Sequence, residues 1–300
     1  MKKFILFLLL ASPIMAQDFL PLYSAGIPND KGMANRQTAV NGADGIERIS
    51  KVTIPTYRFF PASNAKEPRA CVVICPGGGY RILASSHEGY DIAAKFNEIG
   101  VSALVLYYRL PEDSAQIEKK FAPLQDAQSA IALVRKNAVK WNVDPAKVGI
   151  MGFSAGGHLA ATASTHFNKD YTGIQADANL RPDFSILLYP VISFRPFGHG
   201  GSSQSLLGKN PSEEDLALFS NEEQVTAQTP KAFIVHAADD NAVPLKNSLV
   251  YAEKLAANKV SVDLHVYAKG GHGFGLNNKT TSGDLWFDRL ITWMKANQLL

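Results

Sequence analysis

The segment from Lys147 to Ala163 places a serine between an apolar run and a run of small residues. Residues 148–151 have the character of a strand, and residues 159–163 suit a tightly packed helix. Between them lies a G-x-S-x-G sequence with Ser154 at its centre. A serine in a sharp turn needs neighbours two residues away that carry no side chain, and Gly152 and Gly156 meet that need. This strand–turn–helix context predicts a nucleophile elbow with Ser154 as nucleophile.

Further unbroken apolar runs recur along the chain, which is typical of strands buried on both faces of a parallel sheet. With the run before Ser154 they cover residues 70–75, 101–106, 148–151, 184–189 and 232–235. Residues 260–267 alternate apolar and polar, which predicts a half-exposed strand near the edge of the sheet. Peripheral strands are predicted at 53–54 and 57–60.

Helical patterns separate these runs. One apolar face is predicted from Leu124, Ala127, Ile131 and Val134, and another from Leu245, Leu249, Ala252 and Ala256. Alternating strands and helices predict a single α/β domain with a doubly wound, mostly parallel sheet flanked by helices.

The first sixteen residues have the pattern of a signal peptide. Lys2 and Lys3 precede the apolar run 4–10, and Ala16 is a small residue at the predicted cut before Gln17. The run is too short to cross a bilayer and no comparable run follows. We therefore expect a signal peptide at 1–16 and a catalytic domain at 17–300, secreted, with the periplasm as its compartment and no membrane association in the mature form.

Charge and cysteine content narrow the function further. Without the two leader lysines the chain has 28 basic and 27 acidic residues, and no basic run predicts a nucleic-acid partner. Cys71 and Cys75 lie in one predicted strand, where four residues span ~13 Å. A disulfide requires less than about 7 Å, so we expect two unpaired, buried thiols.

A serine nucleophile needs a base to accept its proton and an acid to orient that base. In folds with such an elbow, the order along the chain is serine, acid, histidine. His272 lies in a glycine-rich loop directly after the last predicted strand, and we predict that it is the base. The other histidines are disfavoured by their positions: His87, His158, His166, His199, His236 and His265.

The acid is predicted in the segment 236–244, which follows the strand at 232–235. Asp239 and Asp240 are adjacent, so their side chains diverge and only one is expected to face His272. We predict Asp240 as the acid and Asp239 as a turn or capping residue.

The reaction also needs hydrogen-bond donors for the oxyanion. One is the backbone N–H of Ala155, directly after the nucleophile. Gly78 and Gly79 are predicted to supply the others, because consecutive glycines let bare backbone approach a substrate. A phosphate-binding role is disfavoured, since neither G-x-G-x-x-G nor a Walker lysine is present. Candidate pocket residues are Tyr80, Arg81, Tyr90, Phe194 and His199.

The longest interval between two predicted strands covers residues 193–230. Capping-box spacings at 210–213 and 220–223 predict two helix starts within it. An insertion at this edge of the sheet is placed to lie over the active site, although an ordinary surface excursion is an equal alternative.

These motifs together resemble the α/β-hydrolase superfamily, and within it the acetyl xylan esterase-like branch related to hormone-sensitive-lipase-type esterases. The resemblance runs from about Val72 to Phe274 and depends on segments 75–80, 87–89, 108–110, 152–158, 186–192, 236–244 and 270–275. It implies Ser154, Asp240 and His272 as triad and 77–79 as oxyanion loop. The chain departs from the pattern at Pro76, where lipase-like relatives have the histidine of H-G-G-G.

The resemblance implies a secreted serine carboxylesterase that removes small acyl groups, acetyl above all, from xylan or xylo-oligosaccharides. An enzyme of this kind requires no metal or organic cofactor. The alternatives are another ester, such as feruloyl, sialate or a different sugar O-acyl group, and a peptidase. A non-catalytic binding module is disfavoured because every part of the catalytic set is present. The motifs leave the acyl group, the sugar and the oligomeric state open.

Overall fold

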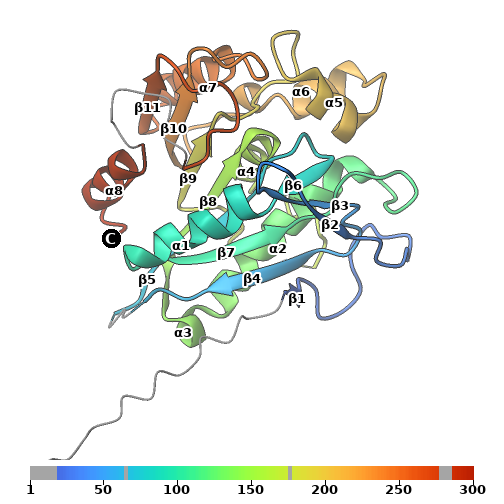
Figure 1. Ribbon diagram of the computed structural model, residues 1–300, viewed down its shortest axis with the longest axis horizontal. Coiled ribbons are helices and arrows are strands. Elements are labelled where there is room, and N and C mark those ends of the chain that lie inside the picture. Colours follow the sequence, from blue (N-terminus) through green and yellow to red (C-terminus); the bar gives the residue numbers. More distant parts are fainter. Residues whose placement is uncertain (1–18, 64–66, 175–177, 277–285) are drawn as a thin grey trace, which may run out of the picture.

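The computed structural model describes residues 19–63, 67–174, 178–276 and 286–300. The predicted signal peptide lies outside the described residues. Within them, an eight-stranded sheet forms the centre of the molecule (Figure 1). Its strands lie in the order β1 (Leu20–Pro21), β4 (Thr56–Phe60), β7 (Ser102–Tyr107), β5 (Arg69–Cys75), β8 (Val143–Phe153), β9 (Phe184–Leu188), β10 (Lys231–Ala237) and β11 (Val262–Tyr267).

The strands from β7 to β11 pair in parallel, whereas β4 and β1 pair antiparallel at the other end of the sheet. Strands β7 and β9 are buried along their whole length, as their unbroken apolar runs predict. Cys71 and Cys75 are buried in β5 and unpaired. The predictions of a mostly parallel sheet and of free thiols are therefore confirmed.

Helices cover both faces of this sheet. Helices α2 and α4 contact each other and β8 on one face, α7 contacts β10 and β11, and α1 lies against β7 on the other face (Figure 1). On that other face α1 contacts α8 through Phe96 and Phe287, whose ring centroids are 5.5 Å apart. None of the described helices is long and apolar enough to span a membrane. The helices are α1 (Asp91–Glu98), α2 (Ala122–Lys136), α3 (Ala138–Trp141), α4 (Ser154–Thr165), α5 (Gly200–Leu207), α6 (Glu213–Leu218), α7 (Lys246–Ala257) and α8 (Trp286–Ala296).

The predicted apolar face of α2 is buried. In α7 the prediction was wrong, because a different face of the helix is buried. Leu249 on the predicted face is 47% exposed, whereas Asn247 and Ser248 are fully buried with Tyr251 and Leu255. The polar residues can be buried because they are hydrogen-bonded. Asn247 Oδ1 accepts hydrogen bonds from two backbone N–H groups after β9. The Ser248 hydroxyl is hydrogen-bonded to Nδ1 of His236 on β10.

The amino-terminal region also differs from the prediction. Residues 53–54 form no strand, because Lys51 has a left-handed backbone with φ of 54° and Pro55 has no N–H to donate. A second, three-stranded antiparallel sheet was not predicted, since one of its strands lies after β5 in sequence. Its strands are β2 (Thr38–Asn41), β3 (Glu47–Ser50) and β6 (Ile82–Ala84).

Within 193–230 the helix starts differ in detail. Ser212 caps α6 by accepting the Asp215 N–H at 3.0 Å, so the cap is two residues later than the predicted Asn210. The second predicted start is a single 3₁₀ turn at Asn221–Glu223. Helix α5, capped by His199, was not predicted, because histidine is an uncommon N-cap.

Strand β11 lies at the edge of the central sheet, as the alternation of 260–267 predicts. The alternation itself breaks, since Val266 is 45% exposed. The ring of His265 packs instead against Phe233, with centroids 4.8 Å apart.

Candidate active site

Five parallel strands, β5, β8, β9, β10 and β11, end at the same edge of the sheet (Figure 1). Each is followed by a segment that carries polar or glycine-rich chemistry. Because the strands are parallel neighbours, these segments converge although they are far apart in sequence. The site is built from the segments 76–80, 154–157, 189–193, 238–243 and 269–275.

Ser154 is the first residue of α4 and directly follows β8. Its φ of 50° is in the left-handed region, a strained backbone for a residue with a side chain. A Cβ atom at Gly152 would lie 2.0 Å from the carbonyl oxygen of Gly156. The turn therefore requires glycine at this position, as expected for a nucleophile elbow.

Two other segments of the site are hydrogen-bonded to this serine in series. They are the loop 269–275, which carries His272, and the segment 238–243 after β10, which carries Asp240. His272 Nδ1 lies 2.7 Å from Asp240 Oδ2, and its Nε2 lies 2.8 Å from Ser154 Oγ. An ionised carboxylate can only accept, so Nδ1 donates to Asp240. Nε2 is then unprotonated and accepts from the serine hydroxyl. The three residues predicted from the sequence are thus brought together with the tautomer that a general base needs.

Asp240 is held as an anion by several donors. Its Oδ1 accepts from the backbone N–H groups of Ala242 and Val243 at 2.9 and 2.8 Å. Burial raises the pKa of this carboxyl group, but hydrogen bonds from His236, His272 and the Val243 N–H outweigh burial and hold the pKa below its usual range. The carboxylate can therefore stabilise a positive charge on His272.

Asp239 has a different role from its neighbour. Its Oδ1 accepts the backbone N–H of Gly271 at 2.7 Å. The two adjacent carboxylates therefore hold successive residues of the same loop, one the backbone and one the imidazole. The sequence predicted Asp239 as a turn or capping residue, and this contact to residue 271 has no local sequence signal.

The glycine loop after β5 lies next to the nucleophile. Gly78 and Gly79 have φ of 134° and 64°, and a Cβ at Gly78 would lie 2.2 Å from the Ile82 carbonyl oxygen. The N–H of Gly77 donates to Glu88 and is not available to a substrate. Within the described part of the chain, the N–H groups of Gly78 and Gly79 have no protein acceptor. Together with Ala155 at the start of α4, they are suited to bind an oxyanion.

Tyr80 and Arg81 directly follow this loop, and the first side chain is buried whereas the second is exposed. Tyr80 is only 2% exposed, and its hydroxyl lies 2.8 Å from His158 Nδ1 inside the protein. Its side chain is therefore not available to contact a substrate, contrary to the prediction. Arg81 is exposed beside the loop, where its Nε donates to Ser205 Oγ at 3.2 Å.

The segment 193–230 packs beside the oxyanion loop. Besides the contact of Ser205 with Arg81, the ring of Phe194 stacks on His158 with centroids 4.2 Å apart. Burial, and then the charges of His272 and Arg81, lower the pKa of His199 at the start of α5. The start of α5 is thus within electrostatic reach of the triad. A hollow of about 550 Å³ lies there, lined by residues including Phe194, His199, Ser203 and Gln204.

Two buried residues beside the triad were not predicted. Glu88 is 4% exposed and accepts hydrogen bonds from Gly77 and from the hydroxyl of Tyr189. The segment 87–89 was singled out only by the resemblance, and Tyr189 belonged to an apolar run. Neither pattern indicates a contact between them, because 101 residues separate the two in sequence.

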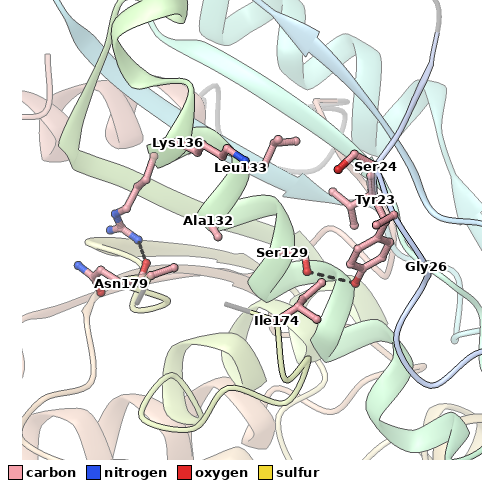
Figure 2. A pocket seen from close by; sticks show the side chains of 13 residues that line it. Tyr23, Ser24, Gly26, Ser129, Ala132, Leu133, Lys136, Ile174 and Asn179 are labelled. Atoms are coloured by element: carbon pink, nitrogen blue, oxygen red, sulfur yellow. Dashed lines mark hydrogen bonds between the residues drawn. The ribbon is translucent and has the colours of Figure 1, made fainter. Parts of the chain in front are cut away.

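A second hollow, of about 690 Å³, lies away from the triad between the segment 22–26 and α2. Figure 2 shows Tyr23 and Ser129 among the residues that line it, where the Ser129 hydroxyl donates to the Tyr23 hydroxyl oxygen at 3.1 Å. The hollow extends to Lys136 at the end of α2, at the opposite edge of the sheet from Ser154. In the ranges that the structure describes, no cluster of three or more histidine, cysteine or acidic residues is arranged to hold a metal ion.

A mostly parallel sheet with a serine elbow after a central strand, and with its acid and base after later strands, defines the α/β-hydrolase class, and the chain has this architecture. Within that class, the sequence profile of the BD-FAE family matches residues 59–255. This match covers well over half of the chain. The chain therefore belongs to the BD-FAE family of α/β-hydrolase esterases.

Individual relatives agree with this assignment. The chain is 38% identical over 230 residues to endo-1,4-beta-xylanase B of Butyrivibrio fibrisolvens, covering 74% of this chain and 36% of the relative. It is 37% identical over 232 residues to the acetylxylan esterase of Xylanibacter ruminicola, covering 75% and 45%. The chain thus spans less than half the length of these two relatives.

A solved structure is similar over almost the whole chain. The acetyl ester-xyloside bifunctional hydrolase from Caldicellulosiruptor lactoaceticus is 32% identical, with a TM-score of 0.79, covering 96% of this chain and 100% of that one. The fold is therefore shared over almost the whole chain with this bifunctional hydrolase.

Proposed function

We propose that this chain is a serine carboxylesterase that removes small acyl groups, with acetyl esters of xylan and xylo-oligosaccharides as its substrates. The observation that carries the proposal is the continuous hydrogen-bonded chain from Ser154 Oγ through His272 to Asp240. It lies beside the N–H groups of Gly78 and Gly79, which have no acceptor among the described residues. The printed names of two relatives, an acetylxylan esterase and an acetyl ester-xyloside hydrolase, support the substrate class.

In the acylation step, Ser154 Oγ attacks the ester carbonyl carbon as its proton moves to His272 Nε2. The carbonyl oxygen becomes negatively charged and is stabilised by the N–H groups of Gly78, Gly79 and Ala155. The intermediate then collapses, and the imidazolium gives its proton to the leaving sugar oxygen. The acyl group remains on Ser154 and the sugar leaves as an alcohol.

In the deacylation step, water takes the place of the sugar. His272 Nε2 accepts a proton from water as its oxygen attacks the acyl carbon. The second tetrahedral intermediate collapses with return of the proton to Ser154 Oγ, and the carboxylic acid is released. Asp240 stays ionised throughout and keeps the imidazole in the required tautomer.

The test is acetate release from acetylated xylan and xylo-oligosaccharides, with p-nitrophenyl acetate as reference ester. Ser154→Ala should lower kcat/KM on the reference ester by at least about 10⁴-fold, because it removes the nucleophile. Ser261→Ala changes an exposed serine directly before β11, at the opposite end of that strand from the site, and as the matched control it should keep full activity. Turnover that survives in Ser154→Ala would exclude the mechanism.

The same assay separates the substrate proposal from the mechanism. Acetate release from the sugars that is lost in Ser154→Ala supports both. Serine-dependent activity on p-nitrophenyl acetate without release from xylan or its oligomers would exclude the xylan substrates and leave other esters. We further propose that the protein is exported after removal of residues 1–16, on the pattern of its leader.

A further inference from the structure

Glu88 is a buried carboxylate that none of the steps above uses. It lies in the single π-helical turn Ser86–Tyr90, which follows β6. Both of its oxygens are occupied by donors from the site. Oε2 accepts the Gly77 N–H at 2.7 Å, and Oε1 accepts the hydroxyl of Tyr189 at 2.8 Å. A buried carboxylate is costly to keep in a protein, and this one is retained with a donor on each oxygen.

The first contact fixes the oxyanion loop. Because Gly77 donates to Glu88, its peptide group faces the protein interior. A Cβ at Gly77 would lie 2.7 Å from Glu88 Oε2 and 3.0 Å from Ser154 Cβ. The loop is therefore held between the carboxylate and the nucleophile. The orientation of the next two peptide groups, those of Gly78 and Gly79, depends on this anchor.

The second contact reaches the loop that carries the base. The hydroxyl of Tyr189 donates to Glu88 and accepts the N–H of Gly275 at 3.1 Å. The ring of Tyr189 packs edge-on against His272, with centroids 5.0 Å apart. His87, next to Glu88, makes a second hydrogen bond to the loop that carries His272. Its Nε2 donates to the Gly273 carbonyl oxygen at 2.7 Å. The π-helical turn thus holds the histidine loop at two places.

We propose that Glu88 is a positioning residue that joins the oxyanion loop to the His272 loop, so that one carboxylate sets the distance between the oxyanion donors and the base. Tyr189 is the second member of this connection. The inference rests on the proposed function, because it concerns how that site is assembled. It adds two residues that act through Gly77 and Gly275 and do not touch the reacting atoms.

Burial and charge agree with this arrangement. Burial raises the pKa of Glu88 above its usual range, and the donors Tyr189 and Gly77 and the charges of His87 and His272 oppose this rise only in part. The donors that oppose burial are the same groups whose positions matter for acyl transfer. Loss of the carboxylate would therefore leave two buried donors unpaired beside the nucleophile and the base.

The test is steady-state kinetics on p-nitrophenyl acetate, with active sites titrated by a fluorophosphonate. Tyr189→Phe keeps the ring packing but cuts the link to Gly275, and kcat should fall about 10-fold. Glu88→Ala removes both links, and kcat should fall about 100-fold or more. In both variants KM should change less than about 3-fold, because the contacts to substrate are kept.

Glu88→Gln provides a conservative rescue. Its amide oxygen can still accept the Gly77 N–H, and its NH₂ can donate to the Tyr189 oxygen, so kcat should lie between those of Glu88→Ala and wild type. The double variant Glu88→Gln/Tyr189→Phe should lose less than the product of the single losses, since both act in one connection. If Glu88→Ala does not fold, these variants carry the test.

Asp183→Asn is the matched control. This carboxylate also accepts from a backbone N–H and a side chain, Val148 and Arg135, but it lies at the opposite edge of the sheet. It should lower stability and leave kcat unchanged. A kcat within 3-fold of wild type in Glu88→Gln, Glu88→Ala and Tyr189→Phe would overturn the inference, as would a rise in KM at constant kcat. A Ser154→Ala variant that retains turnover would instead refute the proposed function.

Discussion

At the scale of single residues, the spacing between nucleophile and oxyanion loop depends on Gly156. A Cβ at this position would lie 2.1 Å from the carbonyl oxygen of Cys75 and 2.5 Å from that of Pro76. The first turn of α4 therefore contacts the backbone at the end of β5 directly. Because these neighbours are backbone atoms, they cannot move aside as a side chain could. The absence of one methyl group thus places Ser154 beside the residues that would stabilise its oxyanion.

Gly156→Ala should push α4 away from β5. We expect it to lower the free energy of unfolding by about 3 kcal/mol and to reduce kcat on p-nitrophenyl acetate, because the added methyl has no space. Gly26→Ala is the control, since no atom lies within 4 Å of a Cβ at Gly26, and its effect should stay within about 0.5 kcal/mol. Urea unfolding measures both. Equal stability of the two variants would show that the contact at Gly156 is relieved at little cost.

At the scale of elements, His158 connects three parts of the molecule. It lies on α4, its Nδ1 accepts from the hydroxyl of Tyr80 beside the oxyanion loop, and its Nε2 donates to the Phe219 carbonyl oxygen of the insertion, each at 2.8 Å. Burial lowers the pKa of this imidazole to about 4. The neutral ring satisfies both partners, so the packing of the insertion against α4 depends on a histidine without charge.

This histidine makes stability depend on pH. In the unfolded chain its pKa is 6.5, so between pH 6.5 and 4 the unfolded state binds a proton that the folded state does not. Stability should therefore fall on acidification through this range, by up to about 3 kcal/mol from this group. His158→Gln should be less stable than wild type at pH 7 and show a shallower decline. Urea unfolding at pH 7, 6, 5 and 4 checks this, and parallel declines would contradict it.

At the scale of the whole molecule, pairing of the strands into one sheet both assembles the site and buries the two cysteine thiols. The site segments begin at residue 76 and end at residue 275, so they meet only when the strands have paired. Cys71 and Cys75 lie inside the same sheet, and burial raises the pKa of both thiols. A buried thiol with a raised pKa supplies no thiolate for disulfide exchange. This property suits a protein proposed to be exported to an oxidising compartment.

The export proposal predicts a defined amino terminus. When the full chain is produced in a Gram-negative bacterium, the protein in the periplasmic fraction should begin at Gln17, as intact-mass and peptide spectrometry would show. Leu8→Arg, which places a charge in the apolar run 4–10, should leave the full-length chain in the cytoplasm. An intact Met1 on the wild-type protein from the periplasm or cytoplasm would contradict the proposed cleavage.

The sequence by itself determined the features that depend on near neighbours along the chain. Apolar runs identified the parallel strands, because a strand buried on both faces has no place for polar residues. The glycines around Ser154 indicated the elbow, since the turn excludes side chains two residues away. The order of serine, acid and histidine indicated Asp240 and His272, which the structure brings into hydrogen-bond distance.

Only the tertiary structure decided the contacts between distant residues. Glu88 meets Tyr189, Asp239 meets Gly271, and Tyr80 turns inward to His158, each across a long stretch of chain. The buried polar face of α7 could not be predicted from the sequence for the same reason. A polar residue can be buried only if a partner exists, and that partner is supplied by another element of the fold. Periodicity and spacing report burial and turns within one segment, whereas hydrogen bonds between segments exist only once the sheet has brought their ends together.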